Sequence, residues 1–190
     1  MRRHQLEHAI RTACQIIGEP EVIVVGSQAI LASIPEDALP AIATMSMEVD
    51  ILPMADSNED SARLADLIEG VAGELSPFED LHGYSIDGVD LETSALPGGW
   101  RDRLVKVHNA NTAAPGGDPV FTGWCLDKED LCVAKVCALR EKDREFVGAL
   151  ITAGLVDPAT IQERLAALAD KHRASARAAV GWIASFRASE

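Results

Sequence analysis

The sequence predicts an α+β fold: a small mixed β-sheet with flanking helices, followed by a C-terminal helical bundle. Short β-rich runs alternate with helical segments up to about residue 126, and from residue 127 apolar residues recur with helical spacing almost to the end. A hydrophobic content of 47% over 190 residues is enough to build a globular core. We therefore expect two domains, an α/β domain over residues 1–126 and a helical domain over residues 127–190.

The elements of the first half follow from periodicity and from clusters of Gly and Pro. They are a helix at residues 5–17, a strand at 22–25, a helical turn at 28–33, a loop at 35–40, a strand at 47–52 and a helix at 56–72. Asp87-Gly88 is a favourable tight-turn pair between two β-rich runs, which predicts a hairpin over residues 83–93. A strand at 103–108 and a Gly/Pro-rich loop at 109–119 complete this half.

Three signals at helix ends divide the second half. Asp127 is the expected N-cap of the first helix, and Gly154 ends the second. Asp157 followed by Pro158 opens the third, because proline fits the first helical position. An Ala-rich helix over residues 171–187 is expected last.

The composition limits the partners of the chain. A formal net charge of −13 argues against a broadly basic nucleic-acid surface and suits a basic partner protein. Four cysteines without a CxxC pair predict reduced thiols. No apolar run approaches the roughly 20 residues that span a bilayer, and the N-terminus does not look like a signal segment. We therefore expect a cytoplasmic protein that makes no membrane contact.

Two short motifs point to chemistry. Glu48 and Asp50 are one residue apart on a predicted strand, so both carboxylates point to the same face. Gly26 and Ser27 follow another strand and begin a helical turn, where backbone N–H groups favour phosphate. Each motif alone is common on ordinary surfaces. Together they predict a site for a nucleoside triphosphate (NTP) with Mg²⁺ or Mn²⁺ held by the carboxylates.

The order of strand, Gly-Ser, helix and a strand with two alternate acids resembles the nucleotidyltransferase superfamily related to DNA polymerase β. Further along, Asp130-Leu131-Cys132-Val133-Ala134-Lys135, with Ala138, Arg140, Lys142, Asp143 and Phe146, is similar to the helical signature of AbiEii and MenT-like toxin nucleotidyltransferases. Ser46-Met47-Glu48, Glu74-Leu75-Ser76 and Leu96-Pro97-Gly98-Gly99-Trp100 resemble an actinobacterial branch of that group. The resemblance implies a nucleotidyltransferase-like fold.

The resemblance also implies residue roles. Glu48 and Asp50 would hold the metal and act in catalysis, and Gly26 and Ser27 would bind the triphosphate. Lys135 would act in catalysis and in nucleotide binding by neutralising phosphate charge, with a surface position as its alternative.

Further roles fall on two groups of charged residues. Arg140, Lys142 and Asp143 would complete the nucleotide-binding set, with a solvated helix face as the alternative. A third metal-binding carboxylate is expected on a neighbouring strand, and Asp90 and Glu92 are both candidates. The chain departs from the superfamily pattern in its long gap between residues 27 and 48 and in its Glu where Asp is common. It also lacks an arginine before the acid pair.

By resemblance, the protein is expected to be a metal-dependent nucleotidyltransferase that moves a nucleoside monophosphate from an NTP to an RNA acceptor such as tRNA. It would be the toxin of a toxin–antitoxin pair, bound by a cognate antitoxin protein. Two alternatives stay open. The acceptor is a protein partner or an aminoglycoside, or the fold is a catalytically decayed binding module.

Overall fold

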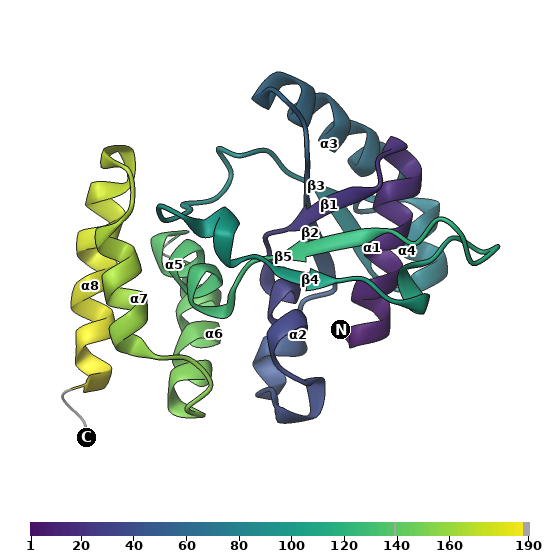
Figure 1. Cartoon of the computed structure of the whole chain (residues 1–190). Coiled ribbons are helices and arrows are strands. Elements are labelled where there is room, and N and C mark those ends of the chain that lie inside the picture. Colours follow the sequence, from purple (N-terminus) through teal and green to yellow (C-terminus); the bar gives the residue numbers. More distant parts are fainter. Residues whose placement is uncertain (139, 188–190) are drawn as a thin grey trace.

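A five-stranded mixed sheet forms the centre of the computed structural model, which describes residues 1–138 and 140–187 (Figure 1). Its strand order is β3-β2-β1-β5-β4. The strands are β1 (Glu21–Val24), β2 (Glu48–Pro53), β3 (Ser85–Gly88), β4 (Val105–Val107) and β5 (Thr122–Cys125). β1 pairs antiparallel with β2 and parallel with β5, β2 pairs parallel with β3, and β4 pairs antiparallel with β5. The predicted α+β fold is confirmed.

Helices flank the sheet, and further helices follow its last strand in the sequence. The α-helices are α1 (Arg3–Ile17), α2 (Ile30–Ser33), α3 (Asn58–Ala72), α4 (Pro77–His82), α5 (Lys128–Ala138), α6 (Glu141–Thr152), α7 (Pro158–Ala166) and α8 (Arg173–Arg187). Short 3-10 helices span Ser27–Ala29, Glu36–Ala38, Ala41–Thr44, Trp100–Arg103, Ala110–Thr112 and Asp170–His172. In Figure 1, α5 to α8 lie together on one side of the sheet, so the predicted helical half is present. Its division from the first half into a separate domain at residue 127 stays a prediction.

The two faces of the sheet carry different side chains. A Cβ at Gly123 would lie 2.3 Å from Cδ1 of Ile10, so α1 packs on the face to which residue 123 points. Val22 is in register with both Gly123 and Pro53, which places these three residues on the α1 face. Side chains alternate along a strand, so Asp50 points to the opposite face.

The predicted hairpin over residues 83–93 is wrong. Asp87 and Gly88 lie inside β3, which pairs in parallel with β2, and the predicted turn does not exist. A Cβ at Gly88 would lie 2.0 Å from the backbone oxygen of Ala65 in α3. This glycine therefore permits close packing of a helix on the sheet, which is a different reason for glycine than a tight turn.

The segment after β3 is a turn. Oδ1 of Asp90 accepts hydrogen bonds from the backbone N–H groups of Glu92 and Thr93, at 2.9 and 3.1 Å. Asp90 and Glu92 therefore share no strand face, and the geometry that suggested them for a third carboxylate is absent. Sequence periodicity also misses α4 and the short strand β5, whose central glycine weakens its strand signal.

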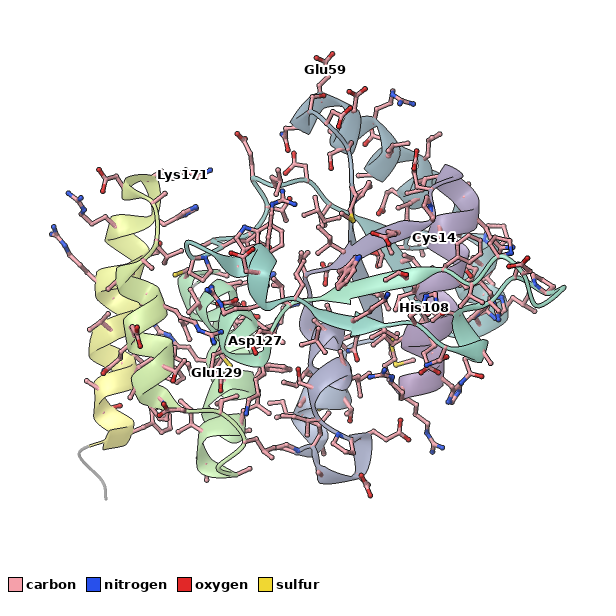
Figure 2. The ribbon with its side chains drawn as sticks, in the orientation of Figure 1. Cys14, Glu59, His108, Asp127, Glu129 and Lys171 are labelled. Atoms are coloured by element: carbon pink, nitrogen blue, oxygen red, sulfur yellow. The ribbon has the colours of Figure 1, made fainter. Side chains whose placement is uncertain are left out.

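A buried carboxylate joins the helical half to the sheet. Asp130 in α5 is fully buried and accepts two hydrogen bonds from Arg103, at 2.8 and 2.9 Å, from the segment before β4. Arg164 of α7 lies 3.0 Å from Oδ1 of Asp130 and also pairs with Asp127. Figure 2 shows Asp127 and Glu129 together at the start of α5. Asp127 accepts a hydrogen bond from the N–H of Glu129, as expected of an N-cap.

The four cysteines are buried free thiols, and burial raises the pKa of Cys14 and of Cys125 to about 12. Within residues 1–138 and 140–187, no helix combines the length and apolar character that a membrane span requires.

Candidate active site

A cleft of about 690 Å³ opens on the sheet face away from α1. Its walls come from the turn after β1, from the segment before β2 and the first half of β2, from the turn after β3, and from α5 and α6. Eight of the ten candidate site residues line it: Gly26, Ser27, Glu48, Asp50, Lys135, Arg140, Lys142 and Asp143. Segments more than 80 residues apart in sequence therefore meet in one place, as the two resemblances together imply. The remaining candidates, Asp90 and Glu92, lie in the turn after β3.

The first wall is acidic. Glu48 and Asp50 alternate along β2 and share one face, with Glu48 exposed and Asp50 largely buried. Burial raises the pKa of Asp50, the positive charge of Lys135 opposes this rise, and the negative charge of Glu48 adds to it. A cation that approaches Asp50 would therefore stabilise the ionised form of its carboxyl group.

Gly26 is required by the position of Asp50. A Cβ at residue 26 would lie 1.5 Å from Oδ2 of Asp50, well inside any allowed contact. The N–H of Val25 donates to the carbonyl oxygen of Asp50 at 3.1 Å, which fixes the turn against β2. Nε2 of the buried Gln28 donates to the carbonyl oxygen of Ser46 at 2.9 Å, which ties the same turn to the segment before β2. The Gly-Ser turn and the acid pair are thus one packed unit.

The opposite wall is cationic. Nζ of Lys135 lies 3.0 Å from Oδ1 of Asp143, and Nε of Arg140 lies 2.5 Å from Oδ2. The ammonium of Lys135 also lies 4.7 Å from the centre of the Phe146 ring, and its side chain is only 11% exposed. Lys135 is therefore held in the cleft wall and is not a surface side chain. The side chain of Arg140 is 59% exposed, so its guanidinium is accessible from the cleft while it pairs with Asp143.

Asp143 is fully buried between these two cations. Burial acts to raise the pKa of Asp143, but the hydrogen bond from Arg140 and the charge of Lys135 outweigh it, so the pKa lies below its ordinary value. Asp143 is thus a permanent anion that orients both cations. The alternative of a solvated helix face does not describe this residue.

Asp87 is a site residue that the sequence reasoning missed. It is in register with Asp50 on the parallel strand β3, so the two side chains lie next to each other on the same face. The pKa of Asp87 is raised to about 6: burial is the main cause, a 2.9 Å hydrogen bond from Ser85 opposes it, and the negative charges of Glu69, Asp50 and Glu48 add to it. Asp87 flanks the acidic wall without lining the cleft itself. Only knowledge of the strand register would have found it.

The acidic wall suits a divalent cation that arrives with phosphate. Across residues 1–138 and 140–187, no three His, Cys, Asp or Glu side chains converge as a ready-made metal cluster. Mg²⁺ commonly takes only one or two protein carboxylates and completes its shell with water and substrate phosphate oxygens. Glu48 and Asp50 supply such a pair, and both carboxylate oxygens belong to the hard donors that Mg²⁺ prefers.

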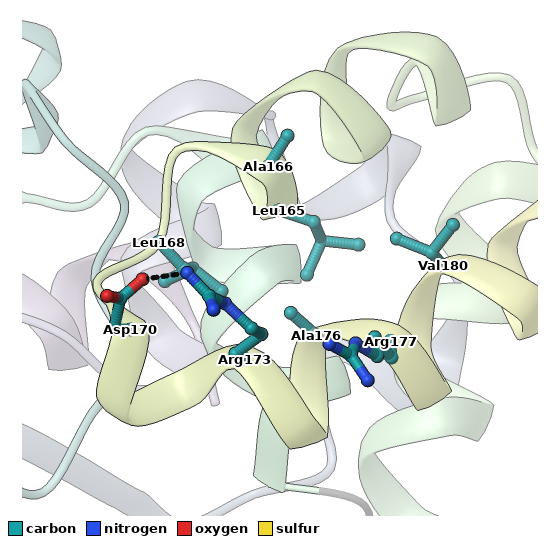
Figure 3. Close-up of a pocket in the computed structure, with 8 residues that line it drawn as sticks. All are labelled: Leu165, Ala166, Leu168, Asp170, Arg173, Ala176, Arg177 and Val180. Carbon is teal, nitrogen blue, oxygen red and sulfur yellow. Dashed lines mark hydrogen bonds and ion pairs between the residues drawn. The ribbon is translucent and has the colours of Figure 1, made fainter.

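A second cavity, of about 350 Å³, lies between α7 and α8 (Figure 3). Its lining is mostly aliphatic, with Arg173, Arg177 and Asp170 at the rim, and Asp170 pairs with Arg173. This lining contains neither a carboxylate pair nor a nucleophilic side chain. The chemistry that the sequence predicts therefore belongs to the cleft over β2.

A strand with two alternate carboxylates, a Gly-Ser turn packed against it and cations in the same cleft are the features on which the resemblance to nucleotidyltransferases rests. The chain belongs to the family described as "Nucleotidyltransferase of unknown function (DUF6036)", whose family model matches residues 4–180. This range includes both the acidic and the cationic wall. No curated protein and no solved structure gives a significant match to the chain.

Proposed function

We propose that the protein is a metal-dependent nucleotidyltransferase that moves a nucleoside monophosphate from an NTP to an acceptor. The observation that carries this proposal is the opposition of two walls in one cleft. A carboxylate pair on β2 faces cations on α5 and α6, so the cleft offers separate places for a divalent cation and for anionic phosphate. Membership of a nucleotidyltransferase family supports this reading.

In this proposal each wall has its own task. Glu48 and Asp50 would hold Mg²⁺ or Mn²⁺, which when bound neutralises triphosphate charge and activates the attacking hydroxyl. Asp87 lies beside Asp50 in the strand register and would add negative charge behind this pair, in place of the expected Asp90 or Glu92. A cation held by Glu48 and Asp50 would favour the ionised form of Asp87, whose pKa is raised by burial.

The other groups position the phosphates. Gly26 leaves the space that Asp50 occupies, and Ser27 begins a helical turn whose N–H groups favour phosphate oxygens. Lys135, which is ion-paired with Asp143, would stabilise negative charge that develops on the transferred group. Arg140 and Lys142, both exposed at the rim, would reach the outer phosphates.

For the acceptor, we propose an RNA such as tRNA, with the protein acting in the cytoplasm as a toxin that a cognate antitoxin protein restrains. The resemblance of residues 130–146 to AbiEii and MenT-like toxins supports this version. A cationic acceptor, such as a basic protein or an aminoglycoside, is the second candidate. The net charge of −13 favours it, because residues 12–100 carry 17 Asp and Glu and a single Arg.

The test incubates the full chain with labelled NTPs, Mg²⁺ and either total RNA, a basic protein or an aminoglycoside. We expect labelled product that EDTA abolishes and excess Mg²⁺ restores. Asp50→Ala should remove transfer, whereas Glu59→Ala, which removes an exposed acid on α3, should not. Calorimetry with Mg²⁺ and NTP separates the outcomes: binding without any product refutes the transferase, and no binding at all indicates a decayed module.

A further inference from the structure

A third pocket, of about 580 Å³, lies between the start of α1, the end of α4 and the 3-10 helix at Ala110–Thr112. It is lined by His4, Gln5, His8, Arg11, His82, Tyr84, Ala110 and Asn111. Its ionisable lining residues are three histidines, one arginine and a tyrosine. No carboxylate lines the pocket, although residues 12–100, which include His82 and Tyr84, are strongly acidic overall.

The imidazole rings are held in place by their neighbours. Nδ1 of His8 lies 2.7 Å from the hydroxyl of Tyr84, and the ring of His8 lies 4.6 Å from that of His82. Phe78 packs 4.4 Å from the ring of His82 and 5.3 Å from that of Tyr84. His4 lies one helical turn before His8 and on the same side of α1. The pocket therefore presents several nitrogen donors on a rigid aromatic support.

Among the residues that the structure describes, no ion pair joins a carboxylate to Arg11 or to the three histidines. Arg11 donates to the backbone oxygen of Asn111 at 3.3 Å and forms no ion pair with a described carboxylate. The nearby carboxylate of Glu7 already accepts hydrogen bonds from Arg3, Asn109 and Asn111. Burial, Arg11 and the two other imidazoles lower the pKa of His8 to about 4. An anion in the pocket would counter the repulsion between His8 and the charge of Arg11.

The carboxylates of α4 do not supply that anion. Glu79 accepts a hydrogen bond from the N–H of Leu75 at 2.7 Å, and Asp80 is exposed. Neither residue lines the pocket.

We propose that this pocket binds a phosphate group, either free or carried by a nucleotide. Arg11 would supply the permanent positive charge, and His4, His8 and His82 would donate hydrogen bonds to the anion. The pocket is larger than a phosphate ion needs, which leaves room for an attached sugar or base. It is distinct from the proposed active site, since α1 and the cleft lie on opposite faces of the sheet.

The test follows the imidazole C2–H NMR signals of the full chain during titration with inorganic phosphate or with a nucleoside monophosphate, in EDTA. We expect saturable shifts for His4, His8 and His82, while His108 and His172, outside the pocket, stay unchanged. Tighter binding of one of the two ligands identifies the source of the phosphate. Sulfate, whose charge stays constant between about pH 4 and pH 7.5, should bind more tightly at the lower pH, because protonation of His8, whose pKa is about 4, adds positive charge to the pocket.

Variants separate the pocket from other anion sites. Arg11→Gln should weaken binding by about tenfold or more, the loss expected for a charged hydrogen-bond donor. His4→Gln alters an exposed side chain and gives a second readout if Arg11→Gln does not fold. His172→Gln is the matched control and should bind as the native chain does. Lys135→Met changes the cleft only and should keep the three shifts.

Three results would overturn the proposal. One is the absence of saturable shifts in the three pocket histidines. Another is native affinity in both Arg11→Gln and His4→Gln. The third is saturable Zn²⁺ binding that depends on His8 while phosphate fails to bind, which would make the pocket a metal site.

Discussion

Gly26→Ala is the sharpest test of how the proposed active site is built. The φ angle of Gly26 is −85°, which alanine adopts without strain, so the substitution adds only a methyl group. That methyl would lie 1.5 Å from Oδ2 of Asp50, whereas ordinary van der Waals contact begins near 3.4 Å. The carboxylate oxygen must therefore move by about 1.9 Å, the difference between these two distances. Overpacking of this kind lowers the free energy of unfolding by about 1–3 kcal/mol.

Transfer should suffer more than stability. A displacement of about 1 Å at a reacting centre costs on the order of 100-fold in rate, so we expect at least about that loss in kcat/KM for NTP-dependent transfer. Urea unfolding measures the stability change. Gly70→Ala is the control, because nothing lies within 4 Å of an added Cβ there, and it should stabilise α3 by roughly 0.5–1 kcal/mol.

A double-mutant cycle shows whether the clash is with Asp50. Asp50→Ala removes the two closest atoms and leaves only its Cβ, at 2.8 Å from the added methyl. Gly26→Ala should therefore destabilise the Asp50→Ala background much less than the native background, with a coupling of about 1 kcal/mol or more. Native transfer and native stability in Gly26→Ala would refute the packing of the turn against β2.

Three further perturbations test the charges. Asp87→Asn should raise the free energy of unfolding by about 1–2 kcal/mol at pH 8 and have no effect below about pH 4. The sign follows because a pKa raised to about 6 means that the native state binds the proton more tightly than the unfolded chain, so the ionised group destabilises the fold at higher pH. Urea curves at several pH values measure this, and a constant difference across pH would contradict it. Asp143→Asn leaves Lys135 buried without its partner, so calorimetry should show weaker binding of NTP with Mg²⁺ and urea unfolding a loss of about 3 kcal/mol; unchanged values would remove Asp143 from its orienting role. Asp130→Asn should destabilise by a similar amount, about 3 kcal/mol in thermal or urea unfolding, against about 0.5 kcal/mol or less for the exposed control Asp66→Asn; equal effects would show that the buried network does not hold α5.

Local patterns were enough to predict the larger part of the proposed cleft. Alternation placed Glu48 and Asp50 on one face, and the Gly-Ser turn after β1 was visible as a break between a β-rich run and a helical one. The signature around Lys135 lies on one helix and its neighbour, so its spacing survives in the fold. Each of these signals depends on residues close in sequence, which periodicity reports well.

The position of Asp87 beside Asp50 depends on pairing between strands, which no local pattern contains. Asp87-Gly88 has the composition of a tight turn. The structure gives a different reason for the glycine: the backbone of Ala65 lies so close to Gly88 that a larger side chain would not fit. A turn at Asp87-Gly88 would place Asp90 and Glu92 on the following strand, so these two residues were expected to supply the third carboxylate. The buried role of Asp143 was invisible for a similar reason, since a charged run on a helix gives no sign of which face another helix will cover.

The order of strands has a consequence for synthesis of the chain. β1 is central, with β2 on one side and β5 on the other, so its second edge has no partner until residues 122–125 have been made. Until then an apolar strand edge is open to pairing with other chains, which makes the nascent protein prone to aggregation. Lys135 follows Asp50 by 85 residues. At a synthesis rate of about 5–20 residues per second, Lys135 is therefore made roughly 4 to 17 seconds after Asp50. A ribosome-bound fragment that ends before α5 thus contains the carboxylates without the opposing charge, and the proposed site can assemble only after residues 135–143 have been made.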